Sequence, residues 1–349
     1  MPEPVLTERA LNRALLARQL LLERSPLGLI EVMERMGGIQ TQYAPAGYIG
    51  LWSRMHDFER PMLTRALEER HAIQATLMRS TIHIVSATDY WPMSAGVRRI
   101  RREWFEKVGR TVVATFDRAA VADAVRRELA DGPLPMKQLN ERLLARGFPE
   151  TAAKWAGMWV DLVRVPPSGT WDRRRADLYG LAEDWLPPID VTEQAGMELL
   201  IRRYLGAFGP APLKDVATWM GMNVGQMRAV ADRVELRRFT DDSGRPLVDL
   251  PGQPLPDPDT PAPARFLAVW DAALLVHARR TQILPEAYRP LVFNTKTPHS
   301  VNTFLVDGQV AGIWRYEHGR VDLSPFRVLT RAERHALDDE AERLAAFHA

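Results

Sequence analysis

The chain of 349 residues contains no cysteine, which excludes disulfide bonds and metal sites with cysteine ligands. This absence agrees with a reducing compartment, and we expect a cytoplasmic protein. No apolar run reaches the roughly 18 residues that a membrane helix needs. The N-terminal segment carries scattered charges and no small-residue cleavage site, so it is not typical of a signal peptide. We therefore expect no contact with a membrane.

Sequence motifs for metals and nucleotides are also missing. The eight histidines show no HExxH or comparable metal-ligand spacing. No P-loop, dinucleotide-binding fingerprint or nucleophile elbow occurs in the chain. We therefore expect no metal site and no cofactor, and we exclude a covalent serine mechanism.

Lysine is scarce: five lysines accompany 41 arginines, and the net charge is only +2. Arginine suits bidentate phosphate contacts and stacking on aromatic rings better than lysine does. A GC-rich coding sequence is the simpler explanation of the arginine count taken alone. A role in binding nucleic acid therefore has to be argued from where the arginines cluster.

The most informative stretch covers residues 37–55 and has the sequence GGIQTQYAPAGYIGLWSRM. Gly37 and Gly38 follow an apolar helical pattern, so they predict the end of a helix and a sharp turn. Gln40 and Gln42 come next, and each amide offers an acceptor and two donors at any physiological pH. From these residues alone, glutamines that cap helix ends are the simpler interpretation.

The hydrophobic periodicity of the chain predicts helices followed by a hairpin, three times over, which is the order of a winged helix-turn-helix. The predicted units are residues 1–115, which include the glutamine turn, 116–188 and 189–250, with hairpins near 73–86, 162–181 and 235–249. A Pro- and Asp-rich linker, 251–264, precedes a small β-rich C-terminal domain, 265–349. The predicted fold class is therefore mainly α with β wings, an α+β fold.

Three local signals are specific enough to place element ends. Thr7 is suited to cap a helix over residues 7–22. Asp307 and Gly308 predict a tight hairpin turn between strands at 303–306 and 309–313. A last helix is predicted over residues 330–347.

Several segments together resemble one protein family. They are residues 38–43 and 50–54, the run LMRSTIHIV at 77–85, Trp270 with Asp271, residues 284–286 and residues 304–308. The chain resembles the AlkZ/YcaQ-type winged-helix DNA glycosylases over nearly its whole length. The family motif is a glutamine, an aliphatic residue and a glutamine or aspartate. Here Thr41 takes the middle position and Gln42 the third, which is similar to the Gln-x-Gln branch.

The resemblance implies a monofunctional DNA glycosylase with Gln40 and Gln42 as catalytic residues. The expected substrates are purines alkylated at N7 or N3 in double-stranded DNA, with bulky or cross-linked adducts among the candidates, and the enzyme is expected to be a monomer. Breaking the N-glycosidic bond passes through an oxocarbenium-like sugar. Because an alkylated purine is already cationic, it leaves without a general acid. Two amide oxygens could then hold the attacking water and place negative partial charge near the sugar.

Basic residues near these motifs are the candidates for DNA contact. Arg79 and His83 lie on the first predicted hairpin, and a basic run on a predicted helix extends to Lys107 and Arg110. A half-buried strand residue explains His83 nearly as well, and a solvated helix face explains the basic run equally well. The full set of candidates is Arg79, His83, Arg98, Arg99, Arg101, Arg102, Arg173, Arg174 and Arg175.

Two other functions fit the same sequence. The first is a non-catalytic winged-helix regulator, in which the glutamine pair has no need to face the DNA. The second is a scaffold that binds proteins through its winged helices. Absence of DNA affinity at low salt would favour the scaffold.

Overall fold

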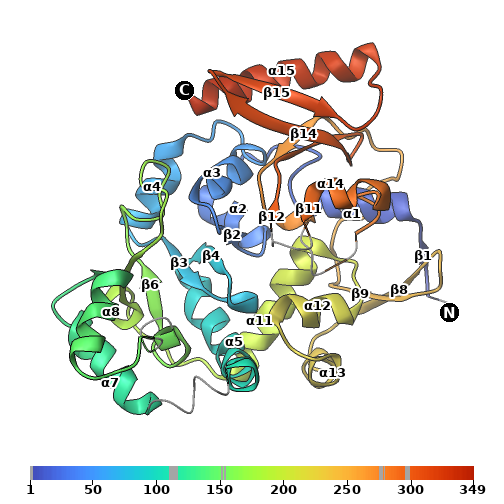
Figure 1. The fold of residues 1–349 in the computed structure, drawn as a ribbon. Helices are drawn as coiled ribbons and strands as arrows, with labels where there is room; N and C mark the ends of the chain where they lie inside the picture. The colour runs from blue at the N-terminus through green and yellow to red at the C-terminus, as the bar shows by residue number, and fades with distance from the viewer. Residues whose placement is uncertain are drawn as a thin grey trace.

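The computed structural model describes residues 3–109, 117–150, 152, 155–274, 278, 280–294 and 299–349 and has an α+β fold (Figure 1). Its largest sheet has six strands in the order β2-β4-β3-β6-β7-β5. These strands are β2 (Ile39–Gln40), β4 (Ile82–Ser86), β3 (Ala72–Thr76), β6 (Leu162–Arg164), β7 (Leu178–Leu181) and β5 (Leu134–Pro135). The turn between β3 and β4 contains a short 3-10 segment, Met78–Ser80.

The first helices form close to where the sequence predicts them. Helix α1 (Glu8–Arg18) begins at Thr7, whose hydroxyl accepts a hydrogen bond from the backbone N–H of Ala10. It ends four residues before the predicted end, because Leu20 adopts a left-handed backbone with φ 55°. The next helices are α2 (Leu29–Arg35), α3 (Ala44–Trp52) and α4 (Arg60–Glu68).

Gly38 allows the chain to pass from α2 into β2. Its φ is +83°, and a Cβ atom at this position would lie 2.9 Å from Cγ1 of Val85 on the neighbouring strand β4. A side chain would therefore both strain the backbone and push β2 away from β4. The glycine keeps the start of the glutamine turn against the sheet.

The first two predicted hairpins belong to one continuous sheet. Strand β3 pairs antiparallel with β6, with Gln74 opposite Arg164 and Ala75 opposite Val163. Helices α7 (Arg118–Leu129) and α8 (Met136–Ala145) and the short α10 (Ala182–Trp185) accompany the second hairpin. The sequence also predicts a helix over residues 150–160, of which positions 151, 153 and 154 lie outside the described residues. The described remainder contains a 3-10 turn, Ala156–Met158.

A long helix, α5 (Ala87–Val108), connects the first hairpin to the second helical group and packs against α11 (Glu193–Phe208). Ser86 caps α5 by accepting a hydrogen bond from the backbone N–H of Asp89. The two helices approach closely at Gly96 and Gly196, where a Cβ on Gly196 would lie 2.3 Å from the carbonyl oxygen of Pro92. Small residues at this crossing therefore fix the distance between the helices.

After α11 come α12 (Leu213–Met220), α13 (Val224–Ala231) and the hairpin of β8 (Arg237–Asp241) and β9 (Pro246–Asp249). The N-terminal strand β1 (Val5–Leu6) adds to this hairpin, parallel to β8. This pairing joins residues more than two hundred positions apart, and no local pattern in the sequence predicts it.

The C-terminal part is a four-stranded sheet in the order β10-β13-β14-β15, followed by a helix. Its elements are β10 (Arg265–Leu267), β13 (Thr303–Val306), β14 (Gln309–Glu317), β15 (Arg320–Pro325) and α15 (Arg331–His348). Short elements between β10 and β13 are two 3-10 turns, Ala272–Leu274 and Glu286–Tyr288, helix α14 (Arg289–Val292), and strands β11 (Phe293–Asn294) and β12 (His299–Ser300). As predicted, the turn at residues 307–308 joins β13 to β14, and Thr330 caps α15.

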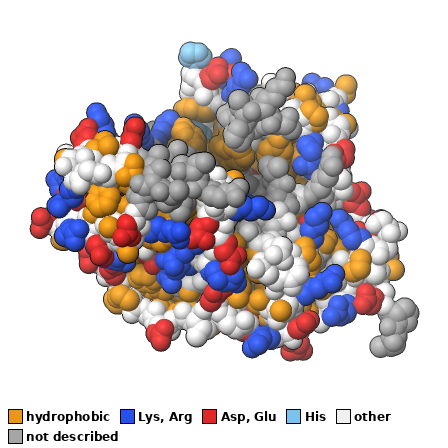
Figure 2. Space-filling view, turned by 60° about the horizontal axis from the view of Figure 1, so that its bottom comes forward, with side chains coloured by type: hydrophobic (Ala, Val, Ile, Leu, Met, Phe, Trp, Pro, Cys, Tyr) orange, Lys and Arg blue, Asp and Glu red, His pale blue; other side chains and the backbone are white. Residues whose placement is uncertain are grey.

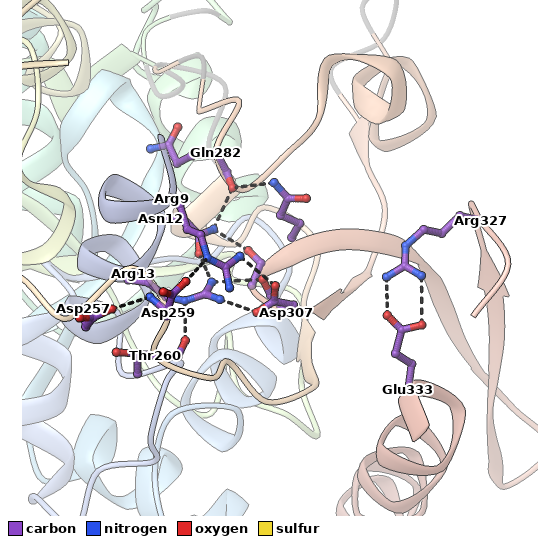
Figure 3. Close-up of polar contacts among 12 residues, drawn as sticks. Arg9, Asn12, Arg13, Asp257, Asp259, Thr260, Gln282, Asp307, Arg327 and Glu333 are labelled. Carbon is purple, nitrogen blue, oxygen red and sulfur yellow. Dashed lines mark hydrogen bonds and ion pairs between the residues drawn. The ribbon is translucent and has the colours of Figure 1, made fainter. Parts of the chain in front are cut away.

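The C-terminal sheet packs on the N-terminal helices, with α15 and β15 lying over α2 and α3 in Figure 1. One hydrophobic cluster combines buried residues from 32–84 with Trp171 and buried residues from 266–344. Two hydrogen bonds of 2.8 and 2.9 Å join the buried Arg54 to Asp271. A second polar network connects α1 to the β13–β14 turn (Figure 3). In it, Asn12 donates to the carbonyl of Gly308, and Arg13 forms an ion pair with Asp307.

No helix among the described residues is both long and apolar enough to cross a membrane.

Candidate active site

The glutamine turn is held against the edge of the six-stranded sheet. Gln40 lies opposite His83 in the β2–β4 pairing, and the backbone N–H of Thr41 donates to the carbonyl of Ile82 at 2.9 Å. Successive side chains of an extended chain point to opposite faces. Gln40 and Thr41 are buried, at 8% and 1% exposed, whereas Gln42, just beyond the end of β2, is exposed.

The amide of Gln40 is fixed by a half-buried arginine. Its Oε1 accepts a hydrogen bond of 2.7 Å from Nη2 of Arg79, and Nη1 of Arg79 donates to the carbonyl of Trp219 at 3.1 Å. Burial lowers the pKa of Arg79 to about 10, so the guanidinium remains charged at neutral pH. The charged donor sets which way the Gln40 amide points, and it leaves the two amide N–H donors for another partner.

The amide of Gln42 is fixed by the backbone instead. Its Oε1 accepts from the N–H of Ile82 at 2.9 Å, and the side chain is exposed. A carbonyl oxygen has two acceptor positions, so one remains for a water molecule or a sugar. Gln42 is therefore both oriented by the fold and open to solvent.

The tip of the second hairpin reaches the glutamine turn. Arg174 donates from Nη1 to the hydroxyl of Tyr43 at 2.9 Å. The tip is anchored by Trp171, which is buried and packs edge-on against Tyr48 of α3 and Phe347 of α15, with ring centroids 5.7 and 5.5 Å apart. Because the tryptophan points inward, the adjacent arginines, Arg173, Arg174 and Arg175, are exposed beside the turn.

His83 is not at the surface, which corrects the expectation of a direct DNA contact. Its side chain is 2% exposed, and Nδ1 lies 3.0 Å from the carbonyl oxygen of Thr81. Burial, with the charge of Arg79 as the second cause, lowers the pKa of His83 to about 3. The imidazole is therefore neutral at physiological pH and fills space behind Gln40.

The arginines of α5 are engaged by the protein, which differs from the phosphate-contacting face that we expected. Arg98 pairs with Asp161 at 2.9 Å. Arg99 bonds to two glutamates, and these bonds raise its pKa. Arg102 donates to the carbonyl of Met158 at 2.8 Å, and Arg101 is buried. The physical reason is that α5 packs against α11 and against the 3-10 turn Ala156–Met158, and these neighbours supply carboxylate and carbonyl acceptors.

The remaining members of the basic run add little to this description. Lys107 is exposed at the end of α5, and Arg110 lies outside the described residues. On the face shown in Figure 2, acidic and basic side chains are interspersed. Most charges there are therefore balanced locally.

Two functional contacts were not visible in the sequence. The bond from Arg79 to Gln40 joins residues 39 positions apart, and the bond from Arg174 to Tyr43 joins residues 131 positions apart. The signal that could have found the second contact is Trp171, a large apolar residue directly before an acidic and three basic ones. Among the described residues, no group of three or more His, Asp or Glu side chains is placed to hold a metal ion.

Comparison with known proteins now bears on this geometry. The structure matches that of the Streptomyces sahachiroi DNA glycosylase AlkZ with a TM-score of 0.82, covering 99% of this chain and 98% of that one, at 18% identity. An interstrand DNA cross-link repair glycosylase from the same organism is 23% identical over 357 residues, 94% of this chain and 93% of that protein. The model of the family described as DNA glycosylase AlkZ-like matches residues 33–347.

The chain is therefore an enzyme of the DNA glycosylase class, which hydrolyses N-glycosyl bonds. Within that class it belongs to the AlkZ-like family, since the family model covers most of its length. The resemblance stated from the sequence is confirmed. The assignment as an enzyme also replaces the two non-catalytic alternatives, the regulator and the scaffold.

Proposed function

We propose that this glycosylase removes purines alkylated at N7 or N3 from double-stranded DNA and leaves an abasic site. Bulky and cross-linked adducts are included among its substrates, in line with the name of the cross-link repair relative. The observation that carries the proposal is the pair of neutral amides in the glutamine turn, each already oriented by a hydrogen bond. A pair without an acid suits a leaving group that is already cationic.

Gln42 is the residue that we assign to the attacking water. It is exposed, its oxygen is held by Ile82, and a second acceptor position is open. A water molecule held there would attack the sugar carbon while the amide dipole stabilises the positive charge that develops on the sugar. Because the amide does not titrate, this assistance is constant across physiological pH.

Gln40 is assigned the neighbouring position. Its oxygen faces Arg79, so its N–H groups are the ones directed to ligand. Donors of this kind could hold the same water or an oxygen atom of the deoxyribose. Fixed amides act without a reorganisation cost when the bond breaks.

DNA binding is assigned to the exposed hairpin tip, with three winged helix-turn-helix units forming the surface around it. The hairpins β3–β4, β6–β7 and β8–β9 would be their wings, and the C-terminal sheet a separate β-rich domain. Arg173, Arg174 and Arg175 would contact phosphates on either side of the lesion. We further propose that the enzyme acts as a monomer in the cytoplasm.

The test is incubation of the full chain with duplex DNA that carries a single N7-alkylguanine, followed by alkali to cleave abasic sites. We expect strand cleavage at the lesion and none in the undamaged duplex. A double variant, Gln40→Ala with Gln42→Ala, is the inactive control, and Gln309→Ala, an exposed glutamine on β14, is the matched control. If the parent binds the duplex but leaves N7- and N3-alkylpurines and cross-links intact, the proposed substrate class is wrong.

A further inference from the structure

A cavity of about 300 Å³ lies between α5, the turn after β3 and the second hairpin. Three arginines line it: Arg79, Arg101 and Arg164. Each comes from a different element, and Arg101 and Arg164 are 8% and 7% exposed. The cavity therefore collects three guanidinium groups at one place inside the protein.

None of these three arginines forms an ion pair with a described residue. Arg101 donates to the carbonyl of Gly157 at 3.0 Å. Arg164 donates to the hydroxyls of Thr76 and Tyr179 at 3.0 and 3.1 Å. The Nε atoms of Arg101 and Arg164 are buried without any hydrogen-bond partner. Every acceptor that they contact is therefore neutral.

The carboxylate that lines the cavity is already engaged. Asp161 accepts from the hydroxyl of Ser94 at 2.8 Å and from Nη2 of Arg98 at 2.9 Å. Its negative charge is balanced by Arg98, which lies outside the lining. The cavity wall therefore carries an excess of positive charge.

Two other buried arginines of this protein are paired with carboxylates. Arg18 faces Asp249, and Arg54 faces Asp271, with all four side chains buried. A buried charge that lacks such a partner has lost its hydration without compensation. Burial accordingly lowers the pKa of Arg101 to about 10, which still leaves it charged at neutral pH. Among the described residues, the cavity arginines thus lack the carboxylate partner that Arg18 and Arg54 have.

We propose that this cavity binds the phosphate group of a nucleotide. Three guanidinium groups match the several oxygen atoms of a phosphate, which they can hold by charge-assisted hydrogen bonds. The volume is at the lower end for small-ligand sites, and it is larger than a bare phosphate needs. Trp104 and Trp155 also line the cavity, and indole rings are suited to stack on a base.

The same charges decide which part of the substrate does not enter. A purine alkylated at N7 or N3 is cationic, and three arginines would repel it. The cavity is therefore assigned to an anionic part of a nucleotide and not to the damaged base. Binding of an anionic group rests on the three arginines alone, whereas exclusion of the damaged base also rests on the proposed substrate.

Occupancy of the cavity is coupled to the active site through Arg79. One guanidinium nitrogen of Arg79 holds the amide of Gln40, and the same side chain lines the cavity. A phosphate that draws on this guanidinium would shift the position of the Gln40 amide. The phosphate is supplied either by the DNA strand or by a free nucleotide.

The test measures thermal unfolding and tryptophan fluorescence of the full chain during titration with inorganic phosphate and with a deoxynucleoside monophosphate. Sodium chloride at matched ionic strength is the reference titration. We expect saturable stabilisation by both phosphate compounds and a fluorescence change with the nucleotide. If chloride reproduces the response of the parent, the cavity is not a phosphate site.

Substitutions of the cavity arginines test whether phosphate binds in this cavity. We expect Arg101→Met and Arg164→Met each to raise the dissociation constant for phosphate at least tenfold. Replacement of a buried charge by an apolar side chain of similar size is commonly tolerated, and Arg101→Lys is a second variant that keeps the charge but loses the forked geometry. Arg265→Met is the matched control, since Arg265 is also buried, lies 3.9 Å from Glu340 and is outside the cavity. Equal phosphate binding by the parent and the cavity variants would overturn the proposal.

Competition identifies the source of the phosphate. If the DNA strand supplies it, a saturating undamaged duplex displaces the bound nucleotide from the parent. If a free nucleotide is the ligand, duplex and nucleotide bind together without competition. Either outcome is independent of excision activity, so the result is separate from the fate of the proposed substrate.

Discussion

Helix α5 and the tip of the β6–β7 hairpin carry similar runs of arginine, but the fold uses them in opposite ways. On α5, Arg98 is paired with a carboxylate and Arg101 is buried. At the hairpin tip, Trp171 packs into the core while Arg174 remains exposed beside Tyr43. A dense run of arginines in the sequence therefore does not show how many of them are exposed and available to bind DNA.

The difference follows from what each segment packs against. Helix α5, of 22 residues, packs against α11 and the 3-10 turn Ala156–Met158, and its long side chains reach acceptors there. At the short hairpin tip, Arg175 pairs with Asp177 and Arg174 bonds to Tyr43, but all three arginines stay exposed. The exposed region formed by Gln42, Tyr43 and the hairpin tip is where we expect the substrate.

The largest expected effect is loss of excision activity when either glutamine is replaced by alanine. Gln42→Ala removes the open acceptor and should lower the excision rate by about a hundredfold or more. Gln40→Ala should lower it comparably, while Gln42→Glu, which can still accept from Ile82, should retain more activity than Gln42→Ala. Single-turnover excision of N7-alkylguanine measures the rates, with Gln309→Ala as the control. If both alanine variants excise the base at the rate of the parent, the glutamines are structural caps and not catalytic residues.

The second prediction compares the two arginine groups directly. Replacing Arg173, Arg174 and Arg175 by alanine should weaken binding to any duplex by roughly tenfold or more and flatten its salt dependence, because each lost phosphate contact removes about 0.9 from the slope. The matched triple variant Arg98→Ala, Arg99→Ala and Arg102→Ala should leave the slope nearly unchanged. Fluorescence anisotropy at several salt concentrations gives both slopes. If the α5 variant loses more of the salt dependence than the hairpin variant, the α5 arginines are the ones that contact phosphates.

The third prediction uses the buried histidine behind Gln40. The folded pKa of His83 is about 3, below the ordinary value of 6.5, so between these values the unfolded chain binds a proton that the native protein does not. The neutral imidazole makes its full contribution to the free energy of unfolding above pH 6.5, and this contribution is lost as the pH falls from 6.5 toward 3. Near pH 5 the loss is on the order of 1–2 kcal/mol. Chemical denaturation at pH 7.5 and pH 5 should show a smaller pH-dependent loss for His83→Gln than for the parent.

His335, which is exposed on α15, provides the control for this measurement. His335→Gln should keep the pH dependence of the parent. If His83→Gln also keeps it, the imidazole is reached by solvent and belongs with the exposed region.

The smallest expected effect concerns the bracing role of α5. Arg98 and Asp161 are partly exposed, so Arg98→Met should cost about 1 kcal/mol of unfolding free energy or less. DNA affinity should stay at the parent value, as measured by anisotropy. A clear drop in DNA affinity with unchanged stability would show instead that Arg98 belongs to the DNA-binding surface.

The sequence predicted what depends on neighbouring residues. Thr7 and Thr330 begin helices as expected, because the capping hydrogen bond lies within one turn. The turn at Asp307 and Gly308 was found for the same reason. The glutamine turn was located through its motif, although the motif carries no information on which way the amides point.

What the sequence could not predict depends on contacts between distant segments. The edge-to-edge pairing of β3 with β6 and the addition of β1 to β8 have no local signal. The bond from Arg79 to Gln40 also requires the left-handed backbone at Arg79, with φ 52°. An arginine run looks the same in sequence whether the fold binds it or exposes it, so the sequence did not show that Arg98 and Arg99 form ion pairs. It also did not show that His83 is buried.

The hydrophobic cluster shared by residues 32–84 and 266–344 has a consequence for biosynthesis. During translation, the helices beside the glutamine turn leave the ribosome well before the strands and helix that complete their core. At about 5–20 residues per second, they wait on the order of ten seconds or more with apolar surface uncovered. We therefore expect the nascent chain to need protection from aggregation in that interval, until α15 packs on Trp171 and completes the core.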